Sequence, residues 1–411
     1  MNLSIIIIGD EILLGQVTDT NSGDIARMLG PKGWSVVETR VVADDADAIR
    51  SAVDAAMRQS DLVITTGGLG PTKDDITKKV LTEYFGGEMV RDPQVTENIK
   101  RVFGARGIKL NEYTLDQALV PSSCRVIQNQ YGTAPIMWFG RDGKVLISMP
   151  GVPFETIGML RYCVIDDIMR YFAPDVELKH HTVIVSGIAE SALAMALDEW
   201  EKALPPTLHL AYLPNPGYIR LRLDGKGASR DEFDKAVSQL KANVHDWFVH
   251  DGDASPAEIL LEKLRNNGYT IATAESCTGG NIAHRITSVA GSSESYLGSV
   301  VSYANSVKET VLGVSAYDLS TAGAVSEPVV LAMAEGVAKL TGSDCSVATS
   351  GIAGPGGGTP EKPVGTVWIA ARTPKITVAE CRHFPGDRSR VIDRATTEAI
   401  MMLARLLDGN R

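Results

Sequence analysis

Short apolar runs alternate with amphipathic segments along the first 85 residues of the chain. The runs are rich in β-branched residues, as strands are, and the segments between them carry apolar residues at helical spacing, such as Ile49, Val53 and Met57. The expected strands cover residues 4–8, 35–42 and 61–66, and the expected helices cover 21–29, 44–57 and 74–85. This βαβαβ order predicts a parallel sheet covered by helices on both faces.

The pattern changes twice further along the chain. Between residues 178 and 250, strands at 181–185, 208–213 and 218–224 mix with helices at 190–204 and 230–244, which predicts a small α+β module. A polar linker at 251–256 then leads into a helix that begins with Ser255 and Pro256. Beyond it we expect strands at 270–274, 298–303, 345–349, 365–371 and 377–384, a helix at 327–340 and a closing helix to about 407.

With 411 residues, the chain is too long for one core, and we expect a multidomain α/β protein. The predicted domains are residues 1–172, a parallel-sheet α/β domain; 176–250, the small α+β module; and 256–411, a second α/β domain.

The composition of the chain indicates its cellular compartment and excludes some classes of binding partner. The net charge of −10 gives no electrostatic footprint for nucleic acid, and no apolar run is long enough to span a membrane. The five scattered cysteines form no C-x-x-C pair, the histidines show no metal-ligand spacing, and the N-terminus lacks the basic region of a signal peptide. We therefore expect a cytoplasmic protein that binds neither nucleic acid nor membrane.

A glycine-rich turn follows the third expected strand. Gly67, Gly68 and Gly70 let the backbone approach a phosphate at the carboxyl end of the sheet, where α/β proteins bind ligands. Asp74 and Asp75 could hold a divalent cation that bridges phosphates, and Asp10 and Glu11 end the first strand at the same edge. The alternative is a plain helix start, in which the two aspartates complement the helix dipole.

Two further loops with glycines follow strands in the last third of the chain. Residues 273–280 offer the hydroxyls of Ser276 and Thr278 before Gly279 and Gly280, and residues 350–358 contain five glycines. Two such loops in one domain predict a ligand cleft, whereas either alone would be compatible with an ordinary surface loop.

Ser293, Tyr303 and Lys308 are candidates for chemistry on a carbonyl group. Serine needs a base, lysine can serve when burial lowers its pKa, and tyrosine can relay a proton or donate to an oxyanion. Spacing alone favours the plainer interpretation, a loop serine and a solvated lysine, and Cys277 is a rival nucleophile. Arg388 could pair with a phosphate or lie free on the surface.

Several motifs, in this order, resemble the family of the competence/damage-inducible protein CinA. Residues 9–15, 19–21, 67–75 and 149–153 resemble its N-terminal domain, which is related to the molybdopterin-binding MoaB/MogA fold. Residues 186–191 and 211–214 look like its middle module. Residues 274–280, 290–293, 350–355 and 362–366 resemble its PncC-type C-terminal domain.

The resemblance implies that the C-terminal domain deamidates nicotinamide mononucleotide to nicotinate mononucleotide and ammonia, with no cofactor. It implies Ser293, Tyr303 and Lys308 as catalytic residues and leaves Ser276 and Cys277 in the binding wall. The expected substrate-binding residues are Glu275, Ser276, Thr278, Gly279, Gly280, Asn305, Ser350, Gly351, Gly354 and Arg388.

For the N-terminal domain the resemblance implies metal-dependent hydrolysis of ADP-ribose, with Asp74 and Asp75 as the expected metal ligands. The expected nucleotide site there consists of Asp10, Glu11, Asn21, Asp45, Gly67, Gly68, Gly70, Asp74 and Asp75. A homodimer is the family expectation. Two alternatives stay open: the pyrophosphatase is the main activity, or the chain is a non-enzymatic competence or recombination accessory that binds a protein partner.

Overall fold

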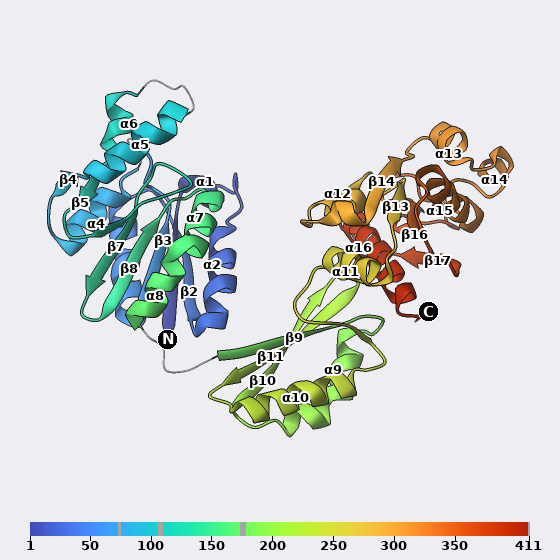
Figure 1. The fold of residues 1–411 in the computed structure, drawn as a ribbon, viewed down its shortest axis with the longest axis horizontal. Coiled ribbons are helices and arrows are strands. Elements are labelled where there is room, and N and C mark those ends of the chain that lie inside the picture. The colour runs from blue at the N-terminus through green and yellow to red at the C-terminus, as the bar shows by residue number, and fades with distance from the viewer. Residues whose placement is uncertain (73–74, 106–109, 173–177, 410–411) are drawn as a thin grey trace. The chain divides into compact units, whose positions relative to one another are not determined.

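The computed structural model describes residues 1–72, 75–105, 110–172 and 178–409. The chain forms two compact units, Met1–Lys179 and His180–Arg411 (Figure 1). None of the helices in these described ranges is both long and apolar enough to cross a membrane.

A six-stranded sheet forms the centre of the first unit. Its strands follow the order β2 (Ser35–Val42), β1 (Asn2–Ile8), β3 (Leu62–Thr66), β8 (Lys144–Met149), β7 (Ile136–Arg141) and β6 (Arg125–Ile127). The first four strands are parallel, as the βαβαβ pattern predicts. The antiparallel strands β7 and β6 extend the sheet on one side, so the sheet is mixed.

Side-chain alternation along β1 separates the two faces of this sheet. Leu3, Ile5 and Ile7 pack with α2 (Asn21–Leu29), α7 (Pro153–Met159), the π-helical segment η2 (Leu160–Val164) and α8 (Ile165–Phe172). Ile6 and Ile8 pack with α3 (Ala46–Gln59) and α4 (Thr77–Phe85) on the opposite face. Both faces of the sheet are therefore covered, which confirms the predicted α/β class (Figure 1).

Smaller elements surround this sheet. They are α1 (Asp10–Leu13), η1 (Gly30–Lys32), α5 (Pro93–Ala105), α6 (Glu112–Asp116) and a two-stranded ribbon of β4 (Met89–Arg91) and β5 (Leu119–Pro121).

The second unit contains two sheets. The first has the order β10 (Leu208–Asn215), β11 (Tyr218–Lys226), β9 (Leu178–Val185) and β12 (Phe248–Asp251), and packs against α9 (Glu190–Lys202) and α10 (Arg230–Asn243). This is the α+β module expected from the sequence.

The second sheet has the order β14 (Tyr296–Val301), β13 (Ile271–Glu275), β15 (Cys345–Gly351), β16 (Thr366–Arg372) and β17 (Thr377–His383). Its first three strands are parallel, and β16 and β17 are antiparallel. The strands β13, β14 and β15 therefore all end at one edge, where residues 276–280, 302–303 and 352–358 follow them.

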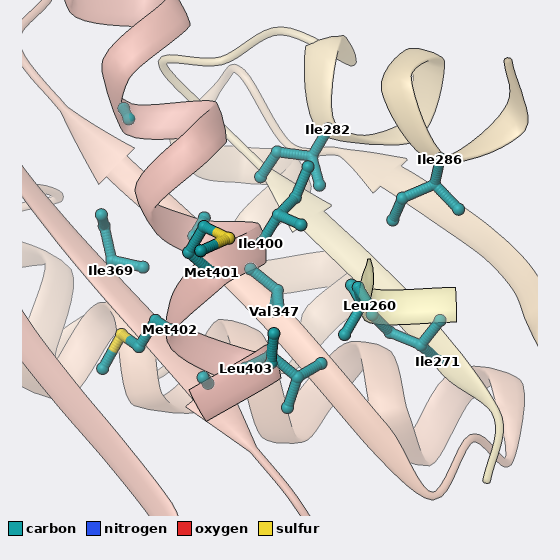
Figure 2. Close-up of a cluster of buried hydrophobic side chains, with 14 of the residues drawn as sticks. Leu260, Ile271, Ile282, Ile286, Val347, Ile369, Ile400, Met401, Met402 and Leu403 are labelled. Carbon is teal, nitrogen blue, oxygen red and sulfur yellow. The ribbon is translucent and has the colours of Figure 1, made fainter. Parts of the chain in front are cut away.

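Helices cover both faces of this second sheet. On one face α11 (Pro256–Asn267), α12 (Asn281–Thr287) and α16 (Arg388–Leu407) enclose a core that Figure 2 shows around Ile271, Val347 and Ile369. Ile184 of β9 and Val249 of β12 belong to the same apolar cluster. On the other face α15 (Glu327–Thr341) packs with Leu312 of α13 (Asn305–Leu312). The short elements η3 (Ser292–Glu294) and α14 (Ala316–Thr321) complete the unit.

Candidate functional site

Lys308 meets a serine hydroxyl at the carboxyl edge of the second sheet. Its Nζ lies 3.1 Å from Ser276 Oγ, 2.7 Å from the carbonyl oxygen of Ser302 and 3.4 Å from that of Tyr303. The side chain is almost inaccessible, with 1% of its surface exposed. Burial lowers the pKa of Lys308 below its ordinary value of 10.5, because desolvation disfavours the ammonium form. The site therefore combines a hydroxyl with an amine that deprotonates more easily than a solvated lysine.

Glu275 fixes the turn that carries Ser276. It is the last residue of β13 and is completely buried. Its carboxylate accepts hydrogen bonds from Thr278 Oγ1 at 2.7 Å and from the backbone N–H groups of Gly280, Ile282 and Ala283 at 2.8–3.0 Å. These donors belong to the turn and to the first turn of α12, which otherwise lack partners. Glu275 thus orders residues 276–283 from inside the protein.

Tyr303 and Arg388 connect this turn to the second glycine loop. Tyr303 follows β14, and its side chain is 62% exposed. Arg388, the first residue of α16, donates to Tyr303 Oη at 3.0 Å and to the carbonyl oxygen of Gly354 at 2.8 Å. Hydrogen bonds therefore join Ser276, Lys308, Tyr303, Arg388 and Gly354, five residues that the sequence assigned to one site.

The remaining predicted binding residues occupy the same edge or its neighbourhood. Ser350 and Gly351 end β15, and Ser350 Oγ donates to the carbonyl oxygen of Ala324 at 2.7 Å. Asn305 begins α13 and is exposed. Lys362, which the sequence did not single out as a site residue, donates to the carbonyl oxygens of Ala322 and Val325, both at 2.8 Å. Its position next to the glycine loop in the sequence is the signal by which Lys362 could have been predicted as a site residue.

Ser293 lies elsewhere. It sits on the exposed turn η3, which precedes β14, whereas Lys308 follows that strand. Six strand residues at ~3.3 Å each separate the two edges of the sheet by about 20 Å. Arg265, near the end of α11, lies 3.8 Å from the adjacent Glu294. Within one chain the structure does not bring Ser293 to Lys308, and the catalytic assignment of Ser293 stays a prediction from the resemblance.

Cys277 has the features of a core residue. The thiol is buried, and burial raises its pKa to about 12. A thiol with that pKa is almost entirely protonated at neutral pH and is a poor nucleophile. Cys277 therefore contributes packing beneath the turn.

The first unit contains a cleft of about 610 Å³ at the carboxyl edge of its own sheet. Seven of the predicted nucleotide-site residues line this cleft, namely Asp10, Glu11, Asn21, Gly67, Gly68, Gly70 and Asp75. Asp45 instead caps α3, where it accepts from the backbone N–H groups of Asp47 and Ala48. Asp74, the other predicted metal ligand, lies outside the described residues.

Three carboxylates of the cleft, Asp10, Asp44 and Asp75, accept hydrogen bonds from backbone N–H groups. Asp75 accepts from the backbone N–H groups of Gly70 and Thr72, both at 2.8 Å, and from Thr72 Oγ1. Burial raises the pKa of Asp44, and repulsion from Asp10, Glu11 and Asp75 adds to this effect. In the described ranges, no three His, Cys, Asp or Glu side chains form a group that could hold a metal ion.

Three polar residues in or beside this cleft were not predicted from the sequence. Asp44 and Gln117 line the cleft, and Lys78 donates to the carbonyl oxygen of Gln117 at 2.6 Å. Burial lowers the pKa of Lys78 to about 8. Asp44 follows the end of β2, so the rule that ligands bind at the carboxyl ends of strands could have found it. Lys78 and Gln117 carry no comparable signal in the sequence.

Three family descriptions match successive parts of the chain. Residues 4–170 match a probable molybdopterin binding domain, residues 180–250 match the damage-inducible protein CinA KH domain, and residues 253–407 match the CinA C-terminal domain. A solved structure of CinA, of unknown function, from Thermoplasma acidophilum is 38% identical, covers 40% of this chain and 96% of its own, and has a TM-score of 0.37.

Relatives match over almost the whole length. A CinA-like protein of Cytophaga hutchinsonii is 44% identical over 405 residues, which cover 98% of this chain and 96% of the relative. A CinA-like protein of Flavobacterium psychrophilum is 42% identical over 413 residues, with 98% of both chains covered. Identity at this level over nearly complete chains, together with the three matching domains, shows that the chain belongs to the CinA family.

Proposed function

We propose that the C-terminal domain hydrolyses the carboxamide of nicotinamide mononucleotide to nicotinate mononucleotide and ammonia. The observation that carries this proposal is the contact between Ser276 Oγ and the buried Nζ of Lys308, at 3.1 Å. Hydrolysis of an amide by serine requires a base beside the hydroxyl, and a desolvated lysine can supply it. The family membership supports the choice of substrate, which the resemblance implies.

The surroundings of Lys308 support its role as the base. A neutral amine has two N–H groups and one lone pair. The carbonyl oxygens of Ser302 and Tyr303, at 2.7 and 3.4 Å, can accept from the two N–H groups. The lone pair then faces the hydroxyl of Ser276, which donates to it. Desolvation lowers the pKa of Lys308 and so favours the neutral amine that catalysis needs.

The reaction then follows the pattern of a serine nucleophile. The proton of Ser276 moves to Lys308 Nζ as Oγ attacks the amide carbon. The C–N bond breaks, and the Lys308 ammonium returns the proton to the leaving nitrogen, which departs as ammonia. Water, deprotonated by Lys308, attacks the resulting ester, and that proton returns to Ser276 Oγ as nicotinate mononucleotide leaves.

Ammonia release from nicotinamide mononucleotide by purified Ser276→Ala and Ser293→Ala variants tests the proposal. We expect Ser276→Ala to lose about 10⁴-fold or more in kcat, the scale of losing a nucleophile, and Ser293→Ala to retain activity. The reverse result would transfer the nucleophile to Ser293, as the resemblance implies. A wild-type chain that releases no ammonia would overturn the proposed function itself.

We also propose that the N-terminal cleft binds ADP-ribose and hydrolyses its pyrophosphate. Two buried acceptors in its lining support this second function. Asn21 and Gln117 are 4% and 7% exposed, and within the described part of the chain Asn21 Oδ1 and Gln117 Oε1 have no hydrogen-bond partner. Ribose hydroxyls are donors that would satisfy them. The described carboxylates do not form a metal-binding group, so no step is assigned to a metal ion.

Binding and hydrolysis of ADP-ribose, measured with and without Mg²⁺, test this second function. We expect Asn21→Ala to weaken ADP-ribose binding about 10-fold, the scale of one lost hydrogen bond. Asp47→Asn, an exposed change on α3, serves as the control and should bind normally. Absence of binding by the wild-type chain would contradict the proposal.

A further inference from the structure

The candidate amidase site carries positive charge that no carboxylate neutralises. Lys362 and Arg388 donate only to neutral oxygens. Among the residues that the structure describes, no ion pair involves either of the two. The chain as a whole has a net charge of −10, so this local excess runs against its overall balance. Unpaired cations at one sheet edge create a positive potential that attracts an anionic ligand.

The backbone N–H groups at the first glycine turn already bind a carboxylate of the protein. The backbone N–H groups of Gly280, Ile282 and Ala283, at the start of α12, donate to the buried carboxylate of Glu275. Phosphates usually bind to amides of this kind. Here a phosphate would find the donors engaged and would meet a fixed like charge. The phosphate subsite is therefore not at residues 278–280.

Arg388 lies on the other side of the site. Its guanidinium has five N–H donors, and the hydrogen bonds to Tyr303 Oη and to the Gly354 carbonyl, at 3.0 and 2.8 Å, involve its two terminal nitrogens. The side chain is exposed to solvent at the start of a 20-residue helix. A planar guanidinium in this position can bind two phosphate oxygens at once.

Tyr303 sets the distance between this cation and the reacting group. Its backbone carbonyl lies 3.4 Å from Lys308 Nζ, and its phenolic oxygen lies 3.0 Å from Arg388. The amine and the guanidinium are thus held apart by the length of one tyrosine. A ligand with a carboxamide at one end and an anion at the other would contact both.

We propose that Arg388 binds the phosphate of the substrate, beside the Gly354 loop, and thereby makes the site specific for a nucleotide over its nucleoside. This inference rests on the proposed amidase function and adds the residue that selects the substrate class. Arg388 acts on binding, whereas Ser276 and Lys308 act on the amide.

The test compares nicotinamide mononucleotide with nicotinamide riboside, which has the same amide and no phosphate. We expect Arg388→Ala to raise KM for the mononucleotide about 10- to 100-fold, the scale of a charge-assisted hydrogen bond, with little change in kcat. The kcat/KM for the riboside should stay unchanged. Arg390→Ala, two residues along α16, is the matched control and should leave both substrates unaffected. Thermal unfolding of each variant checks that it folds.

Equal losses on both substrates would overturn the proposal and leave Arg388 as a residue that positions Tyr303. An unchanged KM for the mononucleotide would overturn it as well. Failure of the proposed function has a different signature, since the wild-type chain would then release ammonia from neither compound. Calorimetric binding of inorganic phosphate to the wild-type chain and to Arg388→Ala decides the anion subsite in that case, and equal binding would refute it.

Discussion

The Nζ atom of Lys308 lies 2.7 Å from the carbonyl oxygen of Ser302, the residue that follows β14. This contact holds the amine inside the protein, where burial lowers its pKa from 10.5. In the proposed mechanism the neutral amine is the competent form, so kcat/KM for nicotinamide mononucleotide should rise with pH. It should level off above a pKa that lies below 10.5.

A pH series of ammonia release measures this profile. Lys308→Met should reduce kcat by about 10²- to 10⁴-fold, the contribution of a general base, and should abolish the acid limb. The exposed Lys339→Met provides a control with the profile of the wild type. A flat profile in the wild type would exclude Lys308 as the base.

Cys277 should resist alkylation in the folded protein. Burial raises the pKa of its thiol to about 12, so very little thiolate exists at neutral pH. The exposed Cys381 provides an internal comparison and should react with iodoacetamide under the same conditions. Mass mapping of labelled peptides separates the two sites. Rapid labelling of Cys277 with loss of ammonia release would contradict this prediction and indicate Cys277 as the nucleophile.

Replacement of Glu275 should destabilise the second unit. Glu275→Ala leaves the N–H groups of Gly280, Ile282 and Ala283 without their acceptor, whereas Thr278 Oγ1 keeps its contact with Thr349 Oγ1. Buried donors without partners cost about 1–3 kcal/mol each, so we expect a loss of at least 3 kcal/mol. Urea denaturation measures the free energy of unfolding. Glu335→Ala, an exposed change on α15, should alter it by less than about 0.5 kcal/mol.

Asp344 should contribute stability that disappears in acid. Hydrogen bonds from the Thr270 backbone N–H at 2.9 Å and from Thr270 Oγ1 at 2.8 Å hold the pKa of Asp344 below its usual 3.8. A depressed carboxyl pKa stabilises the fold fully above 3.8, and the gain is lost as pH falls through the folded-state value. Asp344→Ala should therefore cost about 1 kcal/mol at neutral pH and progressively less below 3.8. A pH-independent difference in urea denaturation would contradict this prediction.

Much of the fold was predictable because local pattern and tertiary burial agree. The helix expected at 21–29 matches α2, whose Ile25 and Leu29 pack on the sheet. The strand expected at 35–42 matches β2. The antiparallel strands β6 and β7 were not predicted. Buried Ile136 and Trp138 mark an apolar strand, and the two residues Asp142 and Gly143 join β7 to β8 as an antiparallel hairpin. This Asp-Gly turn was a signal in the sequence that the prediction did not use.

The sequence predicted most residues of the candidate site, but it did not predict which of them contact one another. Ser276 and Tyr303 follow parallel strands and Ser350 lies at the end of another, so their convergence at one edge follows from topology. The resemblance paired Lys308 with Ser293, although an expected strand separates the two residues. Residues before and after one strand lie at opposite edges of the sheet, and this geometric signal favoured Ser276. Nothing in the sequence indicated that Glu275 accepts hydrogen bonds from the turn. Its donors are backbone N–H groups at the start of α12, and they converge on the carboxylate only in the folded protein.

The shared core of the two sheets in the second unit has a practical consequence for protein engineering. Ile184 and Val249 of the α+β module pack with Leu260, Ile271 and Leu403 of the C-terminal domain. Truncation of the chain in the polar linker at 251–256 would remove Ile184 and Val249 and expose the apolar surface of the C-terminal domain that they cover. The smallest fragment that keeps this core intact therefore begins near residue 180, and shorter fragments would need polar replacements on that surface before they could be fused or exchanged.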